Sequence, residues 1–165
     1  MIIVGFDPGL ATLGYGVIQT DKRQKPQMID YGIVSTPKDE NLAVRLCMLE
    51  KGVKQIIDKF KPNEIAIEEL FFAKNVKTGI AVAHARGVVL LTANKECGNI
   101  FEYTPLQIKQ ALTGYGRADK NQIQQMVKTM LGLKGIPRPD DAADALAVAL
   151  CHAQTNKLGG LFSIR

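Results

Sequence analysis

The hydrophobic positions near the start of the chain follow the short period of β-strands. Residues 2–6 form an apolar run, and residues 13–20 and 28–35 are apolar or alternating. Turn-forming residues, among them Pro8, separate the three stretches. Short strand-like stretches joined by tight turns predict an antiparallel three-stranded meander.

The middle of the chain changes to helical periodicity. Apolar residues fall at spacings of three and four from Asn41 onward, and this pattern ends near Pro62. A short strand, a long helix and another short strand are expected next, at residues 64–68, 76–96 and 100–103. Strands separated by helices predict parallel pairing through right-handed crossovers.

The last third of the chain is predicted to be helical. Thr104 is expected to cap one helix, the polar loop 114–118 ends it, and residues 123–131 carry the apolar positions of a second helix. A last helix is expected from about residue 140 to 153. The fold class is therefore α/β, with a mixed sheet of three antiparallel and then two parallel strands flanked by helices.

Length and composition are consistent with a single domain over residues 1–165, since 46% of the residues are hydrophobic. Cys47, Cys97 and Cys151 are odd in number and far apart, so we expect buried reduced thiols and no zinc or disulfide pair. No apolar run is long enough to span a membrane, and a cytoplasmic location is expected. The net charge of +5 fits solubility alone, but it suits a polyanionic partner if a site can be identified.

Two carboxylates follow directly on predicted strands. Asp7 lies where the first strand breaks into a Pro-Gly turn, although aspartate often begins a turn without further function. Glu68 closes the strand at residues 64–68, at the carboxyl edge where open α/β sheets bind ligands. Because strand side chains alternate, Glu69 must point to the opposite face, and alternation alone leaves open which of the two faces a site.

The last predicted helix carries two more acids in apolar surroundings. Asp141 and Asp144 are three positions apart and so share one face of a helix that is otherwise apolar nearly all round. Burying like charges costs several kcal/mol per ion unless a cation or hydrogen-bond donors offset it. Capping by acids at the helix start would explain Asp140 but not Asp144, a full turn further in.

Four carboxylates without a histidine or cysteine cluster favour Mg²⁺ or Mn²⁺ over zinc. Two such ions can activate a water molecule and stabilise the leaving oxygen of a phosphodiester. His84 and His152 lie within predicted helices and are expected to be packing or surface residues.

Basic and aromatic residues accompany these acids. Lys109, Arg117 and Lys120 surround a glycine-bearing loop, where they can meet phosphates, although a solvated charge run is the simpler interpretation. Phe71 is followed by Lys74, and its ring can stack on an exposed base if it is not part of the core.

Taken in order, these motifs resemble the RuvC family of bacterial Holliday-junction resolvases across essentially the whole chain. The matching stretches are Gly5 to Gly9, Gly14 to Val17, Ala66 to Glu68 with Phe71, Ala73 to Asn75, Ala85 to Gly87, Tyr103 to Pro105, Ile108 with Lys109, Gly114 to Gly116, Lys120 with Gln122, and Asp141 to Ala147. Leu13 departs from the family pattern, in which threonine is common, and some relatives have histidine at the position of Asp141.

The resemblance implies an RNase H-like fold, a homodimer in contact through the helix after Glu68, and Mg²⁺-dependent symmetric nicking of like-polarity strands at a four-way junction. It assigns the family's catalytic, metal-binding acids to Asp7, Glu68, Asp141 and Asp144, with two ions per site, its stacking aromatic to Phe71, and its DNA-contacting lysines to Lys109 and Lys120. It further implies cooperation with the RuvA and RuvB branch-migration proteins.

Two other functions fit parts of the sequence. The glycine-rich segments near Asp7 also resemble the phosphate hairpin of actin-like kinases, but those enzymes close two domains around a nucleotide. A junction-binding protein without nuclease activity is the non-enzymatic alternative.

Overall fold

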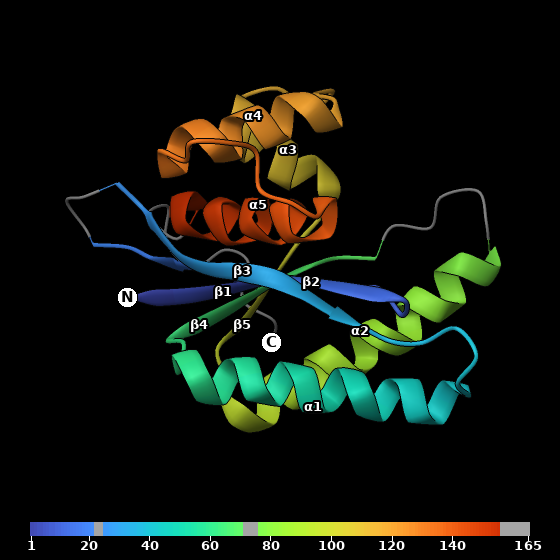
Figure 1. Ribbon diagram of the computed structural model, residues 1–165. Helices are drawn as coiled ribbons and strands as arrows, with labels where there is room; N and C mark the ends of the chain where they lie inside the picture. The colour runs from blue at the N-terminus through green and yellow to red at the C-terminus, as the bar shows by residue number, and fades with distance from the viewer. Residues whose placement is uncertain (22–24, 71–75, 156–165) are drawn as a thin grey trace.

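The computed structural model describes residues 1–21, 25–70 and 76–155. Within them, five strands form one sheet in the order β3-β2-β1-β4-β5 (Figure 1). The strands are β1 (Ile2–Asp7), β2 (Thr12–Gln19), β3 (Gln27–Ser35), β4 (Glu64–Glu68) and β5 (Ile100–Tyr103). The first three pair antiparallel, and β1 pairs parallel with β4 and β4 with β5. The predicted mixed sheet is confirmed.

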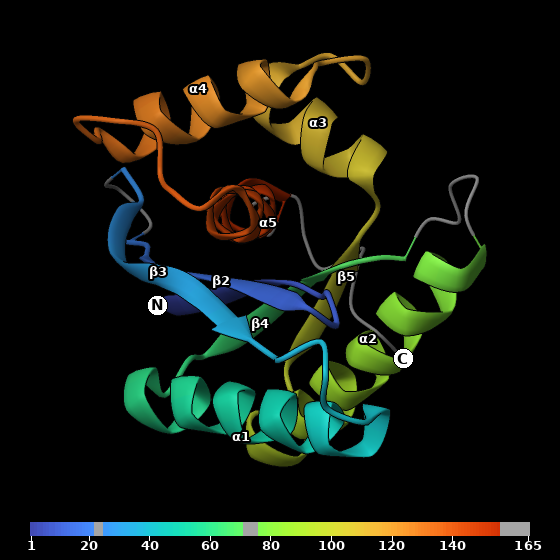
Figure 2. The ribbon, with the colours of Figure 1, turned by 45° about the vertical axis from the view of Figure 1, so that its right-hand side comes forward.

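Five helices cover the sheet in the described residues, and both faces are protected. They are α1 (Leu42–Phe60), α2 (Val76–Glu96), α3 (Pro105–Thr113), α4 (Lys120–Leu131) and α5 (Asp140–Thr155). Figures 1 and 2 show α1 and α2 on one face and α5 on the other, with α3 and α4 forming a further layer over α5. The sheet therefore separates two hydrophobic clusters, one beneath α1 and α2 and one around α5.

Side-chain alternation divides each strand between these clusters. In β1, Ile3 belongs to the cluster around α5, whereas Val4 and Phe6 belong to the one beneath α1 and α2. In β4, Ala66 packs toward α5, and Ile67 packs toward the other side. This register decides which side chains reach each face at the ends of the strands.

Glycines allow α5 to lie unusually close to the strands. A Cβ atom at Gly5 would collide with the carbonyl oxygen of Ala145, and one at Gly14 would collide with that of Asp141. At Gly16 it would lie 2.7 Å from the backbone nitrogen of Leu146. The helix backbone thus rests on the strand backbones, which determines the position of the first turns of α5.

Helix ends coincide with the capping signals in the sequence. The Asn41 side chain accepts a hydrogen bond from the backbone N–H of Val44, 3.0 Å away, at the start of α1. Thr104 and Gln107 form a reciprocal capping box at α3, and Gly114 ends that helix with a positive φ of 70°. The predicted cap at Thr104 is confirmed.

The prediction of three buried cysteines is wrong for Cys47, which is exposed, and holds only in part for Cys97. Cys47 precedes the core residue Leu49 by two positions, so it points to the opposite side of α1. Cys151 on α5 is fully buried. No helix among the described residues is long and apolar enough to cross a membrane.

Candidate active site

Asp7 ends β1 on the face that α5 covers. It follows Ile3 and Gly5 at alternate positions, and both of these contact α5 or its cluster. Its neighbour across the sheet is Gly14 of β2, against which the backbone of Asp141 packs. Strand register and close helix packing therefore bring Asp7 next to the start of α5.

Glu68 ends β4, the parallel neighbour of β1, on the same face of the sheet. It lies two positions after Ala66, which packs toward α5. Glu69 points to the other side, where its charge opposes the lowering of the Arg86 pKa that burial causes. The sequence left the choice between the two glutamates open, and the structure places Glu68 beside Asp7.

The carboxylates at the strand ends interact with one another electrostatically. Burial, followed by the charges of Glu68 and Asp144, raises the pKa of Asp7 to about 8, and Asp141 contributes in the same direction. Asp7 and Glu68 share a side-chain hydrogen bond. Burial also raises the pKa of Glu68 and of Asp144. Acids from β1, β4 and α5 therefore interact at one end of the sheet.

Two lysines lie beside these acids. The Nζ atom of Lys120 is 2.9 Å from Oδ2 of Asp144 and 3.5 Å from Oδ2 of Asp140. The charges of Lys120 and Lys109 both lower the pKa of Glu68, against the larger effect of burial. A positive rim thus borders the acidic cluster on the side of α3 and α4.

The remaining predicted contact residues are less closely tied to the cluster. Arg117 is exposed in the loop between α3 and α4. Phe71 and Lys74 lie outside the described residues. Leu13, the departure from the family pattern, is buried beneath α1 and α2, on the face away from the acids. Its substitution therefore does not change the lining of the acidic cluster.

The donor chemistry of the cluster fits a hard divalent cation. Partly buried carboxylates repel one another and lose hydration, and oxygen ligands are those that Mg²⁺ and Mn²⁺ prefer. In the conformation described, however, no three histidine, cysteine, aspartate or glutamate side chains among the described residues converge as a finished metal site. Asp144 is instead engaged by Lys120.

Two basic residues around the cluster make ionic contacts that were not anticipated from the sequence. Lys120 pairs with acids 20 and 24 positions away, and Arg138 pairs with Asp140. The first contact joins α4 to α5, and only their packing in space brings the partners together. The second lies two positions apart in sequence, in the proline-containing segment before α5, where no helical or strand period applies.

A buried polar network around His152 of α5 joins Glu64, at the start of β4, to Tyr103, at the end of β5. His152, which is fully buried, contacts Oε2 of Glu64 through Nε2 and the hydroxyl of Tyr103 through Nδ1, each at 2.7 Å. Thr155 donates a hydrogen bond to the same hydroxyl. The expectation that the histidines are packing or surface residues is confirmed, since His84 is exposed.

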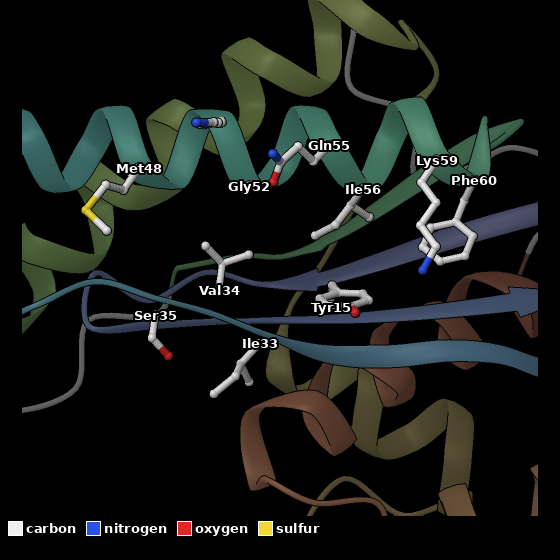
Figure 3. A pocket seen from close by; sticks show the side chains of 11 residues that line it. Tyr15, Ile33, Val34, Ser35, Met48, Gly52, Gln55, Ile56, Lys59 and Phe60 are labelled. Atoms are coloured by element: carbon white, nitrogen blue, oxygen red, sulfur yellow. The ribbon is translucent and has the colours of Figure 1, made fainter.

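A groove of about 500 Å³ between α1 and β3 is a poor candidate for hydrolysis. Figure 3 shows Tyr15, Val34, Ile56 and Phe60 between the helix and the sheet, on the face opposite α5. Its lining contains two lysines and the amide of Gln55 but no carboxylate, imidazole or thiol. The acidic cluster remains the candidate active site.

Comparison with known proteins identifies the family of this chain. The family described as crossover junction endodeoxyribonuclease RuvC matches residues 3–152. The chain is 54% identical to the RuvC protein of Clostridioides difficile (strain 630), over 96% of this chain and 93% of that one. It is 53% identical to the RuvC protein of Alkaliphilus oremlandii (strain OhILAs), over the full length of both.

A solved structure shows that the similarity extends to the fold. Thermus thermophilus RuvC in complex with a Holliday junction substrate superimposes with a TM-score of 0.92 at 36% identity, covering 99% of each chain. The predicted RNase H-like fold is thereby confirmed. The chain belongs to the RuvC family of crossover junction endodeoxyribonucleases.

Proposed function

We propose that this chain resolves four-way DNA junctions by paired, symmetric nicks in strands of like polarity, in DNA recombination and repair. The observation that carries the proposal is the meeting of Asp7, Glu68, Asp141 and Asp144 at one end of the sheet, although they come from three separate elements. Similarity to RuvC proteins over the whole chain supports the junction as substrate.

We further propose that these four acids hold two Mg²⁺ ions, for which Mn²⁺ can substitute. Bound ions of this kind lower the pKa of an attacking water and stabilise charge on the phosphodiester. Within the chain, Asp7 is central, because Glu68, Asp141 and Asp144 all act on it electrostatically. The ends of β1 and β4 and the first turns of α5 orient the carboxylates.

DNA is proposed to be held by the positive rim. Lys109 and Lys120 flank the acids, and Arg117 extends the rim along the exposed loop. Their charges favour phosphate contacts that position the strand without reading its sequence. Phe71 and Lys74, which follow Glu68 in the chain, are proposed to contact the junction bases and backbone there.

Symmetric nicking needs two active sites, and we propose a homodimer in contact through α2. Ile80 and Leu91 of this helix leave 50% and 57% of their surface exposed, which favours a protein contact. Cooperation with RuvA and RuvB branch-migration proteins, and a cytoplasmic location, follow from family membership and are proposed on that basis.

The proposal is tested with a synthetic four-way junction, a linear duplex of the same sequence as control, and Mg²⁺. The wild-type protein is expected to cut the junction only, whereas Asp7→Asn binds it without cutting. Asp58→Asn, a change of the same kind on the exposed surface of α1, is the matched control and should cut normally. If the wild-type protein binds the junction but leaves it intact, the non-enzymatic binding protein is the better description.

A further inference from the structure

Lys120 lies between the DNA-facing rim and the acidic cluster. It is the first residue of α4, where Asp119 and Gln122 form a reciprocal capping box that anchors the start of the helix. From there its ammonium reaches α5, at 2.9 Å from Asp144 and 3.5 Å from Asp140. A well-anchored backbone thus presents one positive charge to a carboxylate proposed as a metal ligand.

The contact competes with a divalent cation in two ways. The ammonium takes up a lone pair of the Asp144 carboxylate, and its charge repels any second cation nearby. Asp7 and Glu68 share a direct hydrogen bond, and no lysine of the described residues forms an ion pair with either of them. In this arrangement the described acids do not form a finished metal site.

The same ammonium remains accessible from solvent. The side chain of Lys120 is 55% exposed, compared with 28% for that of Asp144. Asp140, its second partner, also pairs with Arg138, so its charge is already shared. A phosphate arriving at the rim can therefore exchange places with Asp144 as the partner of Lys120, without any rearrangement of the core.

We propose that Lys120 couples junction binding to metal binding: without DNA its ammonium occupies Asp144 and weakens the hold of the carboxylates on divalent cations, and a DNA phosphate draws it away. This inference rests on the proposed function, because it concerns the same four acids. Coupling of this kind is reciprocal, so a bound cation also tightens DNA binding by the same factor.

The first test measures Mn²⁺ binding to the DNA-free protein by titration calorimetry. Lys120→Gln and Lys120→Met both remove the charge and are expected to tighten Mn²⁺ binding by about fivefold, the upper value for one partly exposed ion pair. Lys120→Arg keeps the charge and should stay near wild type. Lys128→Gln removes the same charge from the last turn of the same helix and serves as the matched control, with no change expected.

The second test measures binding of a fluorescent four-way junction in EDTA and in Ca²⁺. Ca²⁺ should tighten junction binding more for the wild-type protein than for Lys120→Gln, because the variant has already lost the competing charge. Circular dichroism checks that every variant is folded, and two substitutions with different side chains guard against a local folding effect.

The outcomes separate this inference from the proposed function. Suppose that the wild-type protein binds Mn²⁺ and that this binding depends on Asp7. If Lys120→Gln and Lys120→Met then both bind Mn²⁺ with an affinity within twofold of wild type, the coupling role is refuted and the nuclease proposal stands. If the wild-type and Asp7→Asn proteins both fail to bind Mn²⁺, the proposed metal site fails, and the coupling fails with it.

Discussion

Replacing Asp7 by asparagine should stabilise the metal-free protein at neutral pH, although it removes a proposed metal ligand. Asp7 ends β1 among other acids, and burial is the largest cause that raises its pKa from 3.8 to about 8. At pH 7 the unfolded chain has this carboxyl ionised, whereas the folded chain keeps it protonated or bears the cost of its charge. Asparagine has nearly the same shape and no charge to bury.

The size of the effect follows from proton linkage. Each pKa unit is worth ~1.4 kcal/mol, so the interval from 3.8 to pH 7 sets a ceiling of about 4 kcal/mol. Asp7 is only partly buried and solvent screens part of the interaction, so we expect a gain of about 2 kcal/mol in the free energy of unfolding.

This stability effect changes with pH in a predictable way. Between about pH 4 and pH 8 the folded state binds more protons at Asp7 than the unfolded state does, so this residue makes the wild-type protein less stable as the pH rises. The difference between Asp7→Asn and wild type should therefore be near zero around pH 4, grow through pH 7, and level off above pH 8. Titrating groups that do not interact with Asp7 cancel in that difference.

The assay is urea unfolding in EDTA, followed by far-UV circular dichroism because the chain has no tryptophan. Asp58→Asn, whose side chain is 61% exposed, is the control and should change the free energy of unfolding by less than about 0.5 kcal/mol. Added Mg²⁺ should stabilise wild type and leave Asp7→Asn unchanged, since only the native wild-type site binds it. If Asp7→Asn gains the same free energy of unfolding over wild type at pH 4 and pH 7, or gains none at either pH, the reasoning is refuted.

Three further predictions follow from other parts of the chain. Phe71→Ala should impair junction cleavage more than Mn²⁺ binding, because stacking acts on DNA geometry; equal loss of both, measured by gel assay and calorimetry, counts against the stacking role. Lys109→Ala should weaken junction binding and reduce the slope of its salt dependence by about one phosphate contact, and an unchanged slope in anisotropy titrations would exclude that contact. Tyr103→Phe removes the hydroxyl that meets His152 and Thr155 and should cost about 1–3 kcal/mol of stability in urea unfolding; a neutral result would mean that water replaces the hydroxyl.

The elements were predictable because local signals agreed with the fold. Apolar spacing from Asn41 onward located α1, and Thr104 with Pro105 located the start of α3. The change from tight turns to long helical crossovers predicted the change from antiparallel to parallel pairing. Each of these signals lies within a few residues of the feature that it specifies, so neighbouring sequence was sufficient.

Which face a strand residue points to was only half predictable. Alternation requires that Glu68 and Glu69 point to opposite faces of the sheet, but it does not say which of them faces α5. Residue size identifies the two faces. Gly5 and Ala66 are small where the backbone of α5 must approach, and larger residues lie on the face beneath α1 and α2. Small residues opposite an alanine-rich helix were the signal that could have resolved the choice.

The ionic partners of the acids could not be predicted, because their contacts depend on how α4 packs over α5. Lys120 is 24 positions from Asp144, and nothing in the intervening sequence sets the distance between the two side chains. That distance depends on the close approach of α5 to Gly14, which positions one partner, and on the capped start of α4, which positions the other. A larger residue at Gly14 would displace the start of α5 and change both the acidic cluster and its lysine contact at once. The arrangement of charges at the proposed site is thus a consequence of backbone packing, and substitution of a residue that is not itself a ligand can alter it.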